Sequence, residues 1–318
     1  MTAMRDHGWT AGDMPDLAGV RAVVTGANSG LGFHTTLELA RHGASVVLAV
    51  RDEARGADAV ERVLRQVPGA RLEVRDLDLA DLSSVRAFGA ATEGPVDLLV
   101  NNAGVMAVPH RRTADGFELQ FGTNHLGHFA LTGLLLPALR AGSLLGGPAR
   151  VVTLSSMIHR RGRLDRDDLM GERSYSKWAA YGQSKLANLL FMRELQRRAD
   201  AAGVPLLSLG AHPGYAATNL QLAGPRMRGS RAREVFSRLG NMIVAQPAAR
   251  GAWPTLRAAT DPGARGGDYY GPDGFAEQRG HPVLVGMTSR AMDVADAAWL
   301  WERSVELTGV PYDALAPA

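Results

Sequence analysis

The chain contains no cysteine, and this absence excludes several kinds of chemistry at once. Without thiols the protein has no disulfide, no cysteine nucleophile and no thiolate metal site. Its nine histidines form no His-Glu-x-x-His pair or similar ligand cluster. We therefore expect no bound metal.

The sequence also lacks a long apolar run and a strong charge of one sign. The longest apolar run, at 129–139, is shorter than the roughly 20 residues that span a bilayer. The polar N-terminus has no apolar core of a signal peptide. A net charge of +3 with scattered basic residues does not suit a nucleic-acid protein. We expect a soluble, cytoplasmic protein with no membrane span.

What is present is an alternation of apolar, strand-length runs with amphipathic, helix-length segments. Continuously apolar strands separated by helices indicate a parallel sheet covered on both faces. This predicts an α/β fold, a doubly wound, three-layer Rossmann-type sheet in a single domain at 17–318 after an N-terminal extension at 1–16. Strands are expected at 20–26, 44–50, 71–77, 96–104, 149–156 and 204–214, and helices at 32–43, 53–67, 81–92 and 178–195.

One segment, 219–250, breaks this alternation. It mixes Met, Leu and Phe with arginines and follows the strand expected at 204–214. A long insertion near the carboxyl ends of a sheet is often a substrate lid. The alternative, a helical excursion that only covers the edge of the core, fits the segment equally well.

A glycine-rich turn lies between the first expected strand and helix. Gly26, Gly30 and Gly32 follow the spacing G-x-x-x-G-x-G. Glycines at this point allow a tight turn and let the backbone approach a pyrophosphate at the helix N-terminus. An ordinary strand-to-helix turn is the alternative.

A second pattern lies in the helix expected at 178–195. Tyr181 and Lys185 are four residues apart, so they share one helix face. The chain has 35 Lys plus Arg, of which only Lys177 and Lys185 are lysines. Lys is a compact charge on a flexible stem, unlike the planar fork of Arg. The alternative is an amphipathic helix with a boundary tyrosine and lysine; Lys177 has no role that we can name.

Taken together and in order, these motifs resemble the short-chain dehydrogenase/reductase family. The matching stations include the glycine turn, the Asn-Asn-Ala-Gly at 101–104 and Tyr-x-x-x-Lys at 181–185. Further matches are Asn124, Ser156 and the His-Pro-Gly at 212–214. The resemblance covers about 17–215, and its details look most like the retinol-dehydrogenase-like branch.

The resemblance implies roles for four side chains in the interconversion of an alcohol and a carbonyl. Tyr181 would be the general acid or base, and Lys185 would lower its pKa and hold the nicotinamide ribose. Ser156 would bind the substrate oxygen; Ser155 is the alternative, but the family pattern ends with the second serine. Asn124 would complete a proton relay through water, unless its amide is satisfied by its own helix backbone.

The same resemblance implies a nicotinamide cofactor. The position that is acidic in NAD-type members is Val50, and Arg51 follows it, which favours NADP(H) over NAD(H). Asp52 offers Arg51 a local partner and weighs against that preference. The cofactor is expected to contact Thr25, Gly26, Asn28, Ser29, Gly30, Leu31, Gly32, Arg51, Asp78, Leu79, Asn102, Ala103, Gly104, Tyr181, Lys185, Pro213, Gly214 and Thr218.

Two other functions remain open on this fold. One is nicotinamide-dependent epimerisation or dehydration, and the other is a non-catalytic nucleotide sensor or scaffold. A sensor would not need Ser156, Tyr181 and Lys185 together, so their joint presence favours an oxidoreductase. We expect an apolar, small-molecule alcohol or carbonyl substrate and a homodimer or homotetramer.

Overall fold

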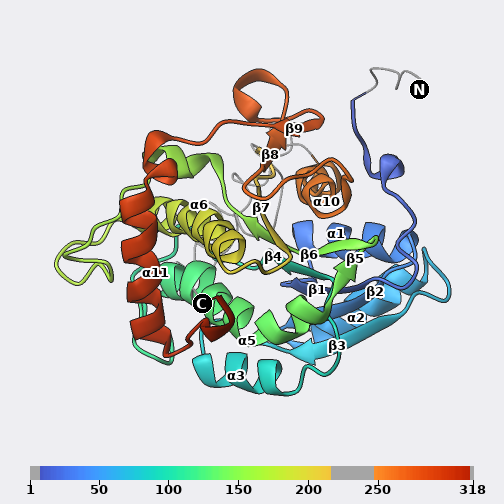
Figure 1. Cartoon of the computed structure of the whole chain (residues 1–318), viewed down its shortest axis with the longest axis horizontal. Coiled ribbons are helices and arrows are strands. Elements are labelled where there is room, and N and C mark those ends of the chain that lie inside the picture. Colours follow the sequence, from blue (N-terminus) through green and yellow to red (C-terminus); the bar gives the residue numbers. More distant parts are fainter. Residues whose placement is uncertain (1–7, 216–246, 316–318) are drawn as a thin grey trace, which may run out of the picture.

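A mostly parallel β-sheet forms the middle layer of the protein (Figure 1). The structure is a computed structural model of the chain and describes residues 8–215 and 247–315. Within those residues the sheet has nine strands. They are β1 (Arg21–Thr25), β2 (Ser45–Val50), β3 (Leu72–Asp76), β4 (Leu98–Asn101), β5 (Ser143–Leu144), β6 (Gly147–Leu154), β7 (Leu206–Ala211), β8 (Tyr269–Pro272) and β9 (Pro282–Leu284).

The strand order is β3-β2-β1-β4-β6-β7-β8-β9, and β5 pairs with β6. Neighbours along this order are parallel as far as β8; β9 and β5 are antiparallel to their partners. The chain runs outward from β1 to β3 and then returns to β4 on the other side of β1. This reversal confirms the doubly wound fold, and ligands bind such folds at the carboxyl ends of the strands beside it.

Helices cover both faces of the sheet (Figure 1). One face carries α1, α2, α9 and α10, and the other carries α3, α5, α6 and α11. The helices are α1 (Gly30–Arg41), α2 (Glu53–Leu64), α3 (Leu82–Ala90), α4 (Leu119–Phe121), α5 (Gly127–Ala141), α6 (Lys177–Ala201), α9 (Ala248–Gly251), α10 (Trp253–Thr260) and α11 (Val294–Thr308). Shorter helical turns are η1 (Ala11–Asp13), the π-helical η2 (Gly122–Leu126), η3 (Met157–Arg161), η4 (Phe275–Glu277), η5 (Ser289–Met292) and η6 (Asp313–Leu315).

Local chemistry explains where several of these elements begin and end. The carboxylate of Asp81 accepts a hydrogen bond from the Ser83 N–H at 2.8 Å and opens α3, as the sequence predicted. The strand predicted at 96–104 ends earlier, at Asn101. It ends there because the next residues leave the sheet and bond to Thr25 at the end of β1.

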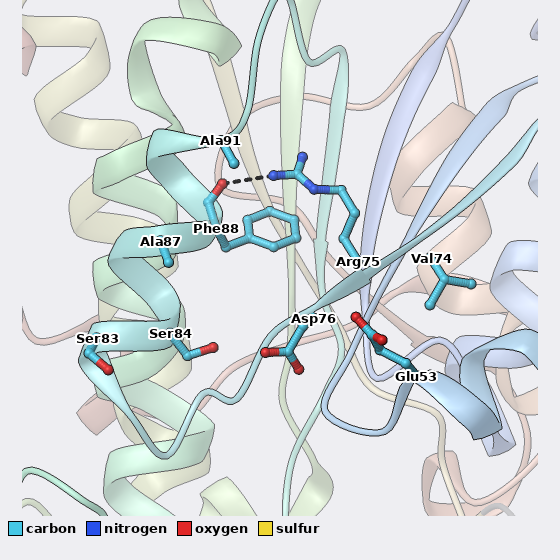
Figure 2. A pocket seen from close by; sticks show the side chains of 9 residues that line it. All are labelled: Glu53, Val74, Arg75, Asp76, Ser83, Ser84, Ala87, Phe88 and Ala91. Atoms are coloured by element: carbon cyan, nitrogen blue, oxygen red, sulfur yellow. Dashed lines mark hydrogen bonds between the residues drawn. The ribbon is translucent and has the colours of Figure 1, made fainter.

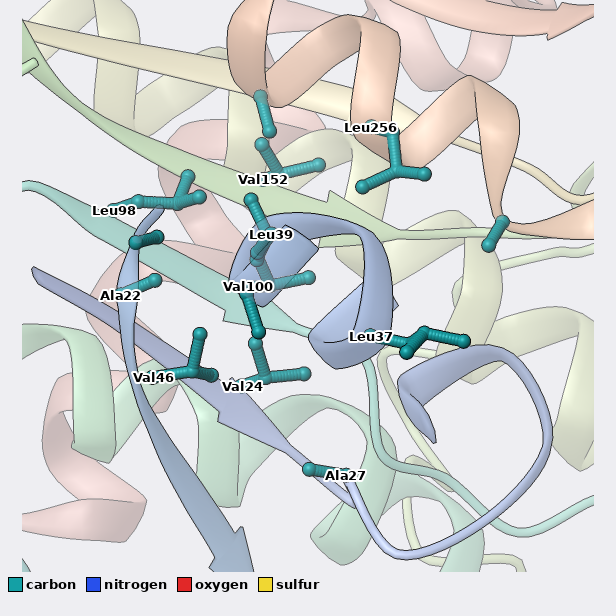
Figure 3. Packing of buried hydrophobic residues seen from close by; sticks show 14 of the residues in the cluster. Ala22, Val24, Ala27, Leu37, Leu39, Val46, Leu98, Val100, Val152 and Leu256 are labelled. Carbon is teal, nitrogen blue, oxygen red and sulfur yellow. The ribbon is translucent and has the colours of Figure 1, made fainter. Parts of the chain in front are cut away.

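The core is split by the sheet into two apolar layers. Figure 3 shows the first layer, in which Val24, Val46 and Val100 of the sheet pack beneath Leu37 of α1 and Leu256 of α10. In the second layer aromatic rings of α5, α6, α11 and the C-terminal segment meet, formed by Phe129, Phe191, Trp301 and Tyr312. Because both faces are buried, the strands show the continuous apolar pattern from which they were predicted.

Two predicted segments are described only in part. Within the extension predicted at 1–16, Ala11 and Met14 are buried in the first core layer. Of the lid predicted at 219–250, residues 219–246 lie outside the described residues, and Ala248–Gly251 form α9. In the part of the chain that is described, no helix is long and apolar enough to cross a membrane.

A buried carboxylate on α6 orients two arginines of the same helix. Glu194 is 1% exposed in its side chain and accepts hydrogen bonds from Arg197 and Arg198 at 2.6–2.7 Å. Arg198 also lies over the Trp301 ring and pairs with Glu302 of α11. Glu194 thus holds Arg198 in place for the contacts that join α6 to α11.

We predict that Glu194→Gln lowers the free energy of unfolding at pH 7 by about 1.5–3 kcal/mol, because it weakens the charged hydrogen bonds from Arg197 and Arg198. Burial alone would raise the pKa of Glu194, but the hydrogen bonds from Arg197 and Arg198 hold it below its ordinary value of 4.5. The stabilisation is therefore complete above that pH and is lost as the pH falls through the folded-state pKa. Urea titrations at several pH values measure this difference.

The matched control is Glu302→Gln. Glu302 pairs with the same Arg198 but is 68% exposed, so this change should alter stability by less than about 1 kcal/mol. Equal losses for the two variants would contradict the prediction.

Candidate active site

The predicted site residues follow the carboxyl ends of neighbouring strands. Asn101 at the end of β4 is in register with Thr153 of β6, and Leu154 of β6 is in register with Ala211 of β7. Since the strands are parallel, the loops that follow them meet at one edge of the sheet. The structure thus brings the loop after β4, Ser156 and the His-Pro-Gly turn to the same side.

Tyr181 and Lys185 lie on α6 where it crosses this edge. Both side chains are buried, at 5% and 4% exposure. The Lys185 Nζ lies 5.9 Å from the centre of the Tyr181 ring and donates to the backbone oxygen of Leu154 at 3.0 Å. A Cβ atom at Gly104 would lie 3.7 Å from that Nζ, so the loop after β4 closes over the lysine.

The ammonium of Lys185 retains hydrogen-bonding capacity. It has three N–H donors, of which one is used on Leu154 in the described part of the chain. A buried ammonium with two remaining donors suits the hydroxyls of a ribose or a water molecule.

The two serines after β6 have different surroundings. Ser155 is buried and its hydroxyl donates to the backbone oxygen of Lys185 at 2.8 Å. Ser156 is partly exposed, caps η3 and lies close enough to the Tyr181 phenol to lower its pKa. These surroundings favour Ser156 over Ser155 as the partner of a substrate oxygen.

Burial controls the ionisation of both groups on α6. Desolvation raises the pKa of Tyr181 to about 12, and the neighbouring Ser156 hydroxyl opposes this shift. Desolvation also lowers the pKa of Lys185 to about 8. From the sequence we expected Lys185 to bring the pKa of Tyr181 below its ordinary value. The structure differs because the loss of solvent around the phenol outweighs other effects, so Tyr181 is protonated at neutral pH.

Asn124 lies in the π-helical turn η2, between α4 and α5. Its Oδ1 accepts from the Val105 N–H at 2.8 Å, and its Nδ2 donates to the Val105 oxygen at 2.9 Å. The same Nδ2 donates to Ser184 Oγ at 2.9 Å, and Ser184 donates to the Tyr181 backbone oxygen. The amide is therefore bonded to the loop after β4 and to α6, not to its own helix. A π-turn of this kind is frequent at functional sites.

The glycine-rich turn meets the requirements of a phosphate site. Gly26 has φ +65°, a left-handed conformation that favours glycine. Ser29 makes no side-chain capping bond to α1, and the first turn of α1 has no acidic residue. Backbone N–H groups and a positive dipole end are thus left for an anion. The other predicted members of the turn, Asn28, Gly30, Leu31 and Gly32, lie at this helix start.

Thr25 joins the glycine-rich turn to the loop after β4. Its Oγ1 accepts from the N–H groups of Asn102 and Ala103, both at 2.9 Å. Asn102 Nδ2 also donates to the Thr25 backbone oxygen at 2.7 Å, and Asn101 Nδ2 donates to Thr132 of α5 at 3.0 Å. Both asparagines therefore brace the site and are more than turn residues.

The predicted adenosine side lies after β2 and β3. The Arg51 side chain is exposed and has no ion-pair partner among the described residues. Asp52 instead caps α2 and pairs with Arg55 at 3.2 Å, so it does not occupy Arg51. Asp78 accepts from the Ala80 N–H at 2.9 Å, and the neighbouring Leu79 is buried.

A surface pocket lies farther out, between β3, α2 and α3 (Figure 2). There the Arg75 guanidinium donates to the Phe88 backbone oxygen at 3.0 Å and lies over the Phe88 ring. Its lining includes Asp76 and Ser84 but neither Ser156, Tyr181 nor Lys185. We therefore do not place the chemistry in this pocket.

The His-Pro-Gly turn is held by residues that the sequence did not indicate. His212 Nε2 lies 2.9 Å from Glu277 Oε2, and Glu277 also pairs with Arg160 of η3. The Gly214 N–H donates to His212 Nδ1 at 3.2 Å. Pro213 lies in this turn, and the predicted Thr218 is outside the described residues.

The sequence analysis missed two residues that contact the predicted site residues. Glu277 lies 65 positions after His212 and carries no local signal. His128 lies in the same motif as Asn124, four residues later, and a helical spacing on the same face was the available signal.

Comparison with known proteins identifies the family of this chain. The sequence profile of the family described as short chain dehydrogenase matches residues 21–224. Polyprenol dehydrogenase from Mus musculus is 42% identical over 301 residues, which cover 93% of this chain and 86% of that protein. Retinol dehydrogenase 14 from Homo sapiens is 39% identical over 319 residues, covering 94% and 89%.

A solved structure is similar over nearly the whole chain. An uncharacterized protein from Mycobacterium paratuberculosis has a TM-score of 0.79 and 47% sequence identity, covering 96% of this chain and 99% of that chain. The fold, the glycine-rich turn, and the Tyr181 and Lys185 pair on α6 fit the same assignment. The chain belongs to the short-chain dehydrogenase/reductase family, and retinol dehydrogenases and polyprenol dehydrogenase are among its relatives.

Proposed function

We propose that the protein is an NADP(H)-dependent oxidoreductase that interconverts an alcohol and a carbonyl compound. One observation carries this proposal. The Tyr181 phenol, the Ser156 hydroxyl and the Lys185 ammonium converge at the carboxyl ends of the central strands, next to the glycine-rich turn.

Tyr181 exchanges the proton in this mechanism. When bound, the nicotinamide supplies the hydride for reduction and accepts it in oxidation. In reduction the phenol of Tyr181 donates its proton to the substrate oxygen, while the Ser156 hydroxyl donates a hydrogen bond to the same oxygen. A pKa of about 12 keeps the phenol protonated at neutral pH, which suits the reduction direction.

Lys185 and Asn124 serve the proton and the cofactor. The two remaining N–H donors of Lys185 would hold one ribose hydroxyl and one water molecule. In a bound complex its positive charge favours the phenolate when Tyr181 has given up its proton. The backbone oxygen of Asn124 accepts from that water and completes the relay to Lys185.

Arg51 provides the preference for NADP(H). Its exposed guanidinium lies directly after β2, where the family binds the adenosine ribose, and Asp52 is engaged by α2 and Arg55. A guanidinium there binds a 2′-phosphate through charge-assisted hydrogen bonds.

The substrate is an apolar alcohol or the matching carbonyl compound. Trp178 lies one turn before Tyr181 on α6, with ring centres 6.3 Å apart, and is 48% exposed. Such a ring offers an apolar wall beside the phenol. The relatives named for polyprenol and retinol agree with this class.

Two other functions would affect the nicotinamide cofactor differently. A nucleotide sensor would bind the cofactor without turnover, and an epimerase or dehydratase would return the nicotinamide to its starting state. A screen of ketones, aldehydes and alcohols with NADPH and NADP⁺, followed by nicotinamide absorbance, separates them. Net oxidation or reduction of the cofactor supports the oxidoreductase.

We predict that Tyr181→Phe lowers turnover about 100- to 10,000-fold, because it removes the general acid and base. The ring and its packing remain, so the thermal transition and the affinity for NADPH should change little. Steady-state kinetics on a substrate from the screen measure the loss. Full turnover in this variant would show that the catalytic assignment is wrong.

We predict that Lys185→Arg weakens NADPH binding roughly 10- to 150-fold, the loss of one charged hydrogen bond, and lowers turnover as well. Arg keeps the charge but not the compact geometry of the ammonium. Fluorescence titration with NADPH measures the affinity. Lys177→Arg, at the only other lysine, is the control and should match the unmodified protein.

We predict that Arg51→Ala weakens NADPH binding roughly 10- to 150-fold and changes NADH binding less than about twofold. Only NADPH carries the phosphate that Arg51 would bind. Arg65→Ala, an exposed arginine just after α2, is the matched control. If the unmodified protein and Arg51→Ala both bound NADH more tightly than NADPH, the proposed preference for NADP(H) would be wrong.

A further inference from the structure

His128 links two parts of the site that the mechanism treats separately. It is 1% exposed and lies on α5, one turn after Asn124. Its Nδ1 is 3.0 Å from the Asn124 backbone oxygen, and its Nε2 is 2.9 Å from Thr25 Oγ1. One ring therefore contacts both the π-turn and the end of β1.

The partners of His128 determine which nitrogen carries the proton. A carbonyl oxygen only accepts hydrogen bonds, so Nδ1 must donate to Asn124. In a neutral ring Nε2 is then an acceptor, and the Thr25 hydroxyl donates to it. The alternative acceptor for that hydroxyl, the Val100 oxygen, is farther away at 3.3 Å.

The hydrogen bonds of Thr25 are complete in this arrangement. Its oxygen accepts from the N–H groups of Asn102 and Ala103, and its proton goes to His128. A charged ring would direct a second N–H at an oxygen that already accepts two. Burial, with a smaller effect from the nearby charge of Lys185, lowers the pKa of His128 to about 4 although the hydrogen bond to Asn124 opposes this shift, so the ring is neutral at physiological pH.

The other end of the ring acts on the Asn124 carbonyl. This oxygen has two lone pairs, and His128 occupies one of them. The bond holds the direction of the carbonyl to which the proposed relay water would bond.

We propose that His128 is a positioning residue. It fixes the glycine-rich turn and the loop after β4 relative to the Asn124 carbonyl. Through Thr25 it holds Asn102, Ala103 and the start of the glycine-rich turn; through Nδ1 it holds the relay carbonyl. The proposal rests on the proposed function in one respect, the use of Asn124 in the relay. The tautomer and the link to Thr25 do not depend on it.

A pair of partial mimics separates the two bonds. The amide of Asn reaches the place of Nδ1, so His128→Asn keeps the donor to Asn124 and loses the acceptor for Thr25. The longer Gln reaches the place of Nε2, so His128→Gln keeps the acceptor for Thr25 and loses the donor to Asn124. His128→Phe loses both.

The variants should therefore fail in different ways. We expect His128→Asn to weaken NADPH binding roughly 3- to 30-fold with kcat changed less than twofold. We expect His128→Gln to bind NADPH within twofold of the unmodified protein, to lower kcat roughly 3- to 30-fold and to shift the pH dependence of kcat. Calorimetric titration with NADPH and steady-state kinetics give the two readouts.

His125 provides the control for a purely structural role. It is buried one turn earlier, 2.9 Å from Ser304 Oγ, among the rings of Phe121, Phe129 and Phe191. His125→Asn and His125→Gln should lower the thermal transition without changing NADPH affinity or the pH profile. The proposal would be wrong if both His128 variants behaved like the His125 variants, or if both showed the same defect in binding or kcat.

A measurement on the unmodified protein covers the case in which the variants do not fold. Long-range ¹H–¹⁵N spectra of ¹⁵N-histidine-labelled protein report the tautomer of each ring. We expect the proton of the His128 ring on Nδ1 and this ring to stay neutral between about pH 6 and 8; His42, His159 and His281 also place Nδ1 near a backbone oxygen, so the His128 signal must be assigned. His128→Phe, if folded, assigns it, and otherwise selective labelling of the backbone does; the Nε2–H tautomer at His128 would overturn the proposal. Neither this spectrum nor NADPH binding requires turnover, so failure of the proposed function is detected separately by Tyr181→Phe.

Discussion

The hydroxyl of Thr25 lies where β1 and β4 diverge, and two backbone N–H groups from the loop after β4 end on it. Strand order separates the two halves of a doubly wound sheet at this point, and a crevice opens there. The crevice has a fixed shape only if the two loops that border it are held together. The Thr25 Oγ1 holds them together. Through this oxygen the glycine-rich turn, the loop at 101–104 and His128 are fixed relative to one another.

The second constraint is burial along α6. This helix is fixed by its contacts with the sheet and with α11, so Tyr181 and Lys185 cannot retreat toward solvent. The same burial that fixes their geometry disfavours charge on both, raising the pKa of one and lowering that of the other. The site is thus arranged around a neutral phenol, and a charged phenolate requires neighbours that compensate for lost water.

The sequence was most informative where a pattern is local. Apolar runs predicted the parallel sheet, and the i, i+4 spacing of Tyr181 and Lys185 placed both on one helix face. It was least informative where tertiary contacts decide. No sequence pattern predicts the π-turn that holds Asn124, because this turn differs from an α-helix only in the register of its backbone hydrogen bonds. The direction in which the pKa of Tyr181 shifts depends on how completely other segments bury the phenol. Glu277 contacts His212 only because the hairpin between β8 and β9 brings it there.

That hairpin connects β8 to β9 at the surface, and its tip looks like an ordinary exposed loop, since Phe275 is 92% exposed. Ala276 and Glu277 nevertheless have φ of +50° and +55°, a conformation that costs a non-glycine residue energy. In this conformation Glu277 reaches both His212 and Arg160. Adjacent Cα atoms are about 3.8 Å apart, so inserting or deleting one residue would carry the carboxylate away from both partners. An exposed loop, usually the most permissive part of a protein to changes in length, is here held to a fixed number of residues by the contacts of Glu277 with His212 and Arg160.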